Sequence, residues 1–144
     1  MSSVFNHILV PCNWTPGAQK AFKKAVKLAE ICQAKITILT CLEDCRTFGF
    51  FKTKASKQEF EKERRLLEKQ HTDMKNLASR FVLVDSKIVK NGKASEKILE
   101  FADRHNADLI ILGKKKHSTH YEKMHYHSTM ESIFRNARCA ILIV

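Results

Sequence analysis

The chain has 144 residues, of which 44% are hydrophobic and 28% are charged. This length suits one domain that buries its core without disulfides or a structural metal. The apolar runs fall short of the ~20 residues that span a bilayer, and the first residues lack the basic and apolar segments of a signal peptide. We therefore predict a single cytoplasmic domain over residues 1–144, with no membrane partner.

The chain carries a net charge of +11, from 26 Lys and Arg against 15 Asp and Glu. Such an excess favours anionic partners, although a solvated lysine-rich surface explains it as well. Charge alone is a weak indication of nucleic-acid binding, so a nucleic acid is not the expected partner. The five cysteines are irregularly spaced and form no Cys-x-x-Cys pair, which indicates free thiols.

The first half of the chain alternates apolar runs with amphipathic helical patterns. Strands are predicted at residues 7–11 and 35–42, with a helix between them that begins at Pro16 after the capping Thr15. A long helix is predicted to begin at the capping-box pattern of Ser56. Its apolar side chains are expected to face the core, namely Phe60, Leu66, Leu67, Met74, Leu77, Ala78 and Phe81.

The second half continues the alternation, with strands predicted at residues 84–90, 107–112 and 140–144. Between them we expect a helix that contains Ile98, and a last helix that begins at Ser128, where Ser128 and Glu131 form a capping box. Apolar strands that alternate with helices indicate an α/β fold with a parallel sheet covered on both faces. Right-handed crossovers make this an open, doubly wound sheet, which binds ligands beyond the carboxyl ends of its strands.

Three segments resemble the universal stress protein family: residues 8–15, residues 107–113 and residues 128–144. They stand in the family's order and spacing and take in essentially the whole chain. The resemblance implies a five-stranded sheet in the order 3-2-1-4-5, a regulatory role in the stress response, and a homodimer joined through the last strand, from Ala140 to Val144. The dimer also has a physical reason, because an apolar strand at a sheet edge invites pairing.

The ATP-binding members of the family carry a motif of glycine, two residues, glycine, nine residues, glycine, and then serine or threonine. Gly113 and Ser128 match its two ends, whereas Lys116 and His127 occupy the other two glycine positions, with ten residues between them. Asn13 replaces the family's adenine-side aspartate. Because lysine and histidine make a glycine backbone geometry costly, the resemblance implies a degenerate loop with weak or altered nucleotide binding. Ordinary ATP binding stays an alternative.

A candidate nucleotide site follows from these matches. Asn13 would contact the base or ribose, and Lys115 and Lys116 would add positive charge. The backbone N–H groups of Ser128 and Thr129, at the predicted helix start, would hold phosphates. The expected ligand is ATP or another nucleotide with Mg²⁺. The predicted site consists of Pro11, Cys12, Asn13, Cys41, Leu112, Gly113, Lys115, Lys116, His127, Ser128, Thr129 and Met130.

The sequence contains no P-loop, nucleophile elbow or metalloprotease motif. We therefore predict no catalytic residue and, at most, slow nucleotide hydrolysis. Three classes of function stay open: a nucleotide-binding regulator, a ligand-free dimeric module that binds a protein partner, and a basic nucleic-acid binder. One predicted loop also contains histidines that could bring imidazoles to a metal, although no standard zinc spacing is present. These histidines are His117, His120, His125 and His127.

Overall fold

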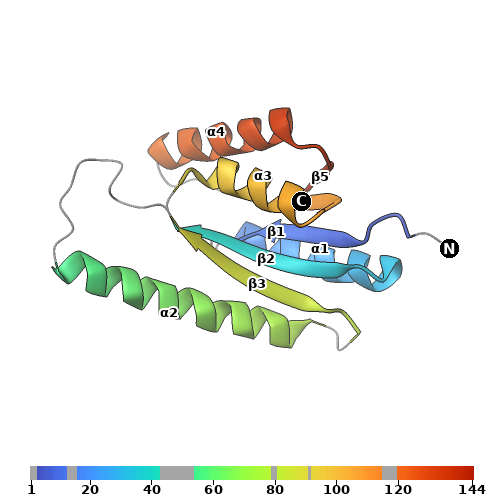
Figure 1. Ribbon diagram of the computed structural model, residues 1–144, viewed down its shortest axis with the longest axis horizontal. Helices are drawn as coiled ribbons and strands as arrows, with labels where there is room; N and C mark the ends of the chain where they lie inside the picture. The colour runs from blue at the N-terminus through green and yellow to red at the C-terminus, as the bar shows by residue number, and fades with distance from the viewer. Residues whose placement is uncertain (1–2, 13–15, 43–53, 79–80, 91, 115–119) are drawn as a thin grey trace.

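The computed structural model describes residues 3–12, 16–42, 54–78, 81–90, 92–114 and 120–144 (Figure 1). Strands and helices alternate along them: β1 (His7–Pro11), α1 (Pro16–Cys32), β2 (Lys35–Leu42), α2 (Lys54–Leu77), β3 (Val84–Lys90), α3 (Ala94–Arg104), β4 (Leu109–Leu112), α4 (His120–Asn136) and β5 (Ala140–Ile143). The strands form one parallel sheet in the order β3-β2-β1-β4-β5. The predicted fold class and strand order are confirmed.

Helices cover both faces of the sheet, and each face has its own core (Figure 1). On one face, α1 and Met74 of α2 pack against Ile8 and Val10 of β1. On the other face, α3 and α4 pack against Leu9 of the same strand. Because neighbouring residues of a strand point to opposite faces, a sheet covered on both sides needs apolar residues at successive positions. No helix of the described residues is long and apolar enough to cross a membrane.

The predicted start of the last helix is wrong, because α4 begins at His120, eight residues before Ser128. The Ser128–Glu131 capping-box pattern therefore lies inside a helix. Such a pattern marks a helix start only where the preceding residues leave the helical conformation. Here the preceding residues include Glu122, Lys123 and Met124, which are good helix formers that extend the helix backwards.

The predicted apolar stripe of α2 is only partly correct. Leu67 and Met74 are buried and Ala78 is half-buried, as expected. Three other predicted core positions are exposed: Leu66 at 56%, Leu77 at 77% and Phe81 at 87%. The buried stripe is narrower than predicted, and it includes a polar residue, His71, between Leu67 and Met74. The side chain of Phe60 lies outside the described residues.

Polar contacts hold the amino ends of the strands. The Asp108 carboxylate accepts the backbone N–H groups of Asn6 at 2.8 Å and of His7 at 3.0 Å. The buried His7 ring donates from Nδ1 to the carbonyl oxygen of His105 at 3.1 Å, so its Nε2 accepts the Thr37 hydroxyl at 2.7 Å. Burial lowers the pKa of His7, which keeps this ring neutral and its contacts intact near neutral pH.

A candidate ligand site at the carboxyl ends of the strands

The strands β2, β1 and β4 are neighbours and run parallel, so their carboxyl ends lie at the same end of the sheet. The chain builds β2 and β3 on one side of β1 and then crosses to place β4 on the other side. A crossing of this kind is the switch point at which open α/β sheets bind ligands. This end of the sheet brings together five of the predicted site residues: Pro11, Cys12, Cys41, Leu112 and Gly113.

The backbone of Cys12 is fixed from both sides. Its N–H donates to the carbonyl oxygen of Leu39 at 2.8 Å, and its own carbonyl oxygen accepts the Thr40 hydroxyl at 2.7 Å. The Cys12 thiol is buried, with its sulfur 3.8 Å from the sulfur of Met74 on α2. Cys12 therefore offers a held main chain to the site, and its side chain belongs to the core.

A buried histidine on α2 completes this arrangement. His71 Nε2 lies 2.7 Å from the Thr40 hydroxyl oxygen, and both residues are buried. Because the single hydroxyl proton of Thr40 goes to the Cys12 carbonyl, Nε2 must carry a proton and donate it to Thr40. Burial lowers the pKa of His71, and the charge of Lys75 lowers it further. The contact joins α2 to the end of β1.

This contact was not predicted from the sequence, although two features of the sequence indicate it. His71 stands four residues after Leu67 and three before Met74, which is the spacing of a buried helical face. Thr40 is a polar residue in an otherwise largely apolar strand. A buried hydroxyl and a buried imidazole each require a hydrogen-bond partner, so each of these residues indicates the other.

Gly113 is required by close packing and not by an unusual backbone angle. A Cβ atom on Gly113 would collide with the carbonyl oxygen of Gly17, and one on Gly17 would collide with the carbonyl oxygen of Lys114. Among the described glycines, the left-handed angle occurs at Gly92 and not at Gly113. The first turn of α1 thus lies directly against the end of β4. Gly17 therefore belongs to the candidate site, although it was not predicted from the sequence.

The predicted phosphate donors are not available where we expected them. Because α4 begins at His120, Ser128 and Thr129 lie in its third turn. There each backbone N–H bonds to a carbonyl four residues earlier, and only the first four N–H groups of a helix are free. Thr129 and Met130 are half-buried, and Met130 packs against the core of the α3/α4 face. The free donors of α4 therefore belong to its first turn, at His120.

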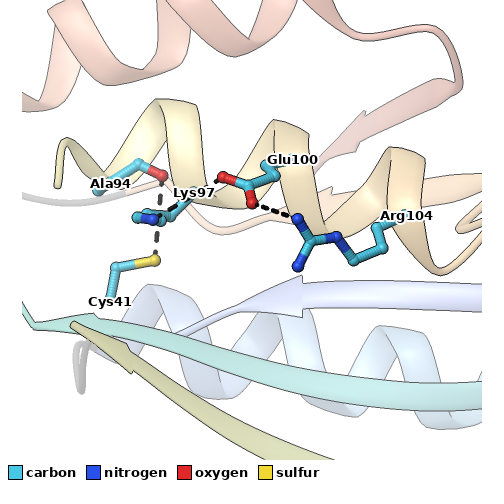
Figure 2. Close-up of polar contacts among 5 residues, drawn as sticks. All are labelled: Cys41, Ala94, Lys97, Glu100 and Arg104. Atoms are coloured by element: carbon cyan, nitrogen blue, oxygen red, sulfur yellow. Dashed lines mark hydrogen bonds and ion pairs between the residues drawn. The ribbon is translucent and has the colours of Figure 1, made fainter. Parts of the chain in front are cut away.

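Cys41, at the end of β2, is half-buried, and its sulfur lies 3.9 Å from the carbonyl oxygen of Ala94 (Figure 2). This contact places the end of β2 beside the start of α3. The thiol therefore lies on the α3/α4 face of the sheet, where Cys41 packs against the core.

Several predicted site residues lie outside the described part of the chain: Asn13, Lys115, Lys116 and the metal candidate His117. The same holds for the side chains of His120, His125, His127 and Ser128. Among the side chains that the structure does describe, no group of three His, Cys, Asp or Glu residues could hold a metal ion. The predicted metal site thus stays a prediction.

The sequence model of the universal stress protein family matches residues 5–144. This match takes in nearly the whole chain and agrees with the strand order of the sheet. The chain belongs to the universal stress protein family.

Relatives and solved structures of this family align along most of the chain. Universal stress protein C of Salmonella typhi is 27% identical over 115 residues, which cover 79% of this chain and 86% of that protein. A universal stress protein solved in complex with cAMP is 20% identical, with a TM-score of 0.66, over 99% of this chain and 98% of that chain. The universal stress protein from Archaeoglobus fulgidus in complex with dAMP is 14% identical, with a TM-score of 0.66, over 97% and 98%. At these identities the two structures establish the fold alone.

Proposed function

We propose that this chain is a regulatory protein of the cytoplasm that binds an adenine nucleotide weakly, or with altered selectivity, beyond the carboxyl ends of β1 and β4. The observation that carries the proposal is the meeting of three strand ends at the switch point of the sheet. The structures of relatives in complex with cAMP and with dAMP support an adenine nucleotide as the ligand class. Binding would serve regulation and not metabolic turnover.

In this proposal the base and ribose lie at the strand ends and are contacted by Asn13. The phosphates extend toward Lys115 and Lys116 and toward the free N–H groups in the first turn of α4. Binding is weaker than in a member with the full glycine motif, because Lys116 replaces one glycine and His127, which replaces another, lies inside α4 and not in a loop. Mg²⁺ would accompany a ligand with more than one phosphate, since it is usually bound through phosphates and few carboxylates.

Calorimetric titration of the purified protein with ATP, AMP and cAMP, each with and without Mg²⁺, tests the proposal. We expect at least one of them to bind, and the double variant Lys115→Gln/Lys116→Gln to weaken that binding roughly tenfold, because charge-assisted contacts to phosphate are lost. The matched control is Lys24→Gln/Lys27→Gln, which removes the same charge from the exposed side of α1. The absence of binding for all three nucleotides would contradict the proposal and favour a ligand-free interaction module.

We also propose a homodimer joined through β5. Among the described strands, β5 pairs with β4 alone and forms one edge of the sheet. Its Ile143 is 44% exposed, and an exposed apolar edge favours pairing with a second copy about a two-fold axis. Sedimentation analysis should show a dimer that Ile143→Asp shifts toward monomer. Ile31→Asp is the control, because Ile31 is 80% exposed on α1. A wild-type protein that is monomeric at every concentration would contradict this.

A further inference from the structure

Strand β3 and helix α3 enclose a groove of about 290 Å³, which begins near the end of β2, where Val89 pairs with Cys41, and follows α3 to His105. Val89 of β3 and Phe101 of α3 supply its apolar surface, and both also pack against the core of the α3/α4 face. None of the predicted nucleotide-site residues whose side chains the structure describes lines it. The groove is therefore a neighbouring surface with a lining of its own, at the other side of α3 from the helix that carries Ser128.

Four basic side chains line this groove: Lys87 and Lys90 from β3, and Lys97 and Arg104 from α3. Among the described residues of the lining, the only carboxylate belongs to Glu100. One carboxylate offsets one positive charge, so three positive charges remain when histidine is neutral. A concave surface with charge of one sign concentrates counter-ions of the other sign, which makes the groove attractive to a small polyanion.

Glu100 holds two of the four cations in place. Its Oε1 accepts from Arg104 Nη2 at 2.9 Å, and its Oε2 lies 3.8 Å from Lys97 Nζ. Figure 2 shows the three side chains along one side of α3, with Glu100 between the two cations. Arg104 follows Lys97 by seven residues, so two helical turns, about 10 Å, separate their attachment points. The guanidinium uses one N–H toward Glu100 and keeps others for a ligand.

We propose that this groove binds a small ligand with two or more phosphate groups. Its volume lies at the lower end of the range of small-molecule pockets, and three positive charges match the charge of a di- or triphosphate. Arginine recognises phosphate in a planar, bidentate manner, and Arg104 is 70% exposed for this contact. The rings of Phe101 and His105 stack with centroids 4.1 Å apart in the same lining, so a ring of an organic phosphate can pack there.

The test uses inorganic tripolyphosphate as the probe, in Mg²⁺-free buffer, followed by calorimetry and by amide chemical shifts. Lys87→Gln/Arg104→Gln should weaken binding at least tenfold, and the wild-type shifts should centre on Val89 and Phe101. Both replaced side chains are exposed, so little change in stability is expected. Lys24→Gln/Lys27→Gln removes the same charge from α1 and should weaken binding less than threefold.

The outcomes separate this proposal from the proposed nucleotide site. Lys115→Gln/Lys116→Gln should leave tripolyphosphate binding at the groove intact, even if it abolishes nucleotide binding. Equal weakening in the groove variant and the α1 control would mean that only net charge matters, and would overturn the proposal. Absence of binding, or loss in the Lys115→Gln/Lys116→Gln variant alone, would overturn it too. A single-stranded oligonucleotide that binds through the same residues and more tightly than tripolyphosphate would overturn the ligand class.

Discussion

The two faces of the sheet hold their helices by different means. On the α1/α2 face the contact is backbone against backbone, since Gly17 of α1 lies directly on Gly113 at the end of β4. On the α3/α4 face the contacts are made by larger side chains such as Ile98 and Ile133, and β3 keeps an open basic groove beside α3. The comparison teaches that the glycine contact fixes the strand ends of the proposed nucleotide site, whereas the groove on the other face offers additional binding surface.

The largest expected effect is the loss of stability when the contact between Gly17 and Gly113 is disrupted. Gly113→Val should lower the free energy of unfolding by roughly 3 kcal/mol or more, because the new side chain collides with the backbone of Gly17 and neither strand nor helix can move freely. Chemical denaturation measures the change. Asp85→Val is the control: it places the same side chain at an exposed position of β3, where surface substitutions have small effects, so its cost should be less than half as large. Equal costs would show that the close approach does not constrain the fold.

The same comparison shows what the sequence could and could not predict. Alanines recur at helical spacing in α1, from Ala18 to Ala29, which is typical of a buried helix side, and the structure buries them. Periodicity reports which side of an element is apolar, but it does not report which backbone atoms meet. The contact between Gly17 and Gly113 joins residues far apart in the chain, so only the arrangement in space reveals it.

The candidate site was less predictable than the fold for related reasons. The helix start was placed at Ser128 because a local capping pattern was read without the helical tendency of the residues before it. The basic groove could not be predicted from the sequence because Lys87 and Arg104 come from separate elements. In the sequence each of them is an ordinary surface charge. The meeting of the strand ends was predictable because alternating strands and helices indicate a parallel sheet, and the family resemblance implied the order of its strands.

Replacing the buried threonine on either face should have an effect of intermediate size on the free energy of unfolding. Thr40→Val removes two hydrogen bonds, to the His71 Nε2–H and to the Cys12 carbonyl oxygen. Thr37→Val, on the other face, removes one, to the His7 Nε2 acceptor. Since each lost hydrogen bond of a buried group costs about 1–3 kcal/mol, Thr40→Val should reduce the free energy of unfolding more than Thr37→Val. Hydrogen exchange should also show weaker protection near Cys12 in the first variant alone.

The smallest expected effect is the loss of stability at acid pH, which shows whether the two faces respond to pH alike. Burial lowers the pKa of His71 on one face and of His7 on the other below the ordinary value of 6.5. Below pH 6.5 the unfolded chain therefore binds protons that the folded chain does not. The free energy of unfolding is fully retained above this pH and falls as the pH drops toward the folded pKa values, by at most about 1.4 kcal/mol per pH unit for each histidine.

Replacing one histidine separates the contributions of the two faces. In His71→Leu the leucine can pack beside Leu67 and Met74, while Thr40 still donates to the Cys12 carbonyl, so the fold should persist. Denaturation curves between pH 8 and pH 5 should then show a shallower loss of stability than in the wild type, with the remaining part due to His7. An unchanged slope would mean that His71 binds its proton equally well in the folded and unfolded chains. Protonation of His71 would then not weaken the contact between α2 and the end of β1. Acid would not destabilise, through this contact, the strand ends at which the nucleotide is proposed to bind.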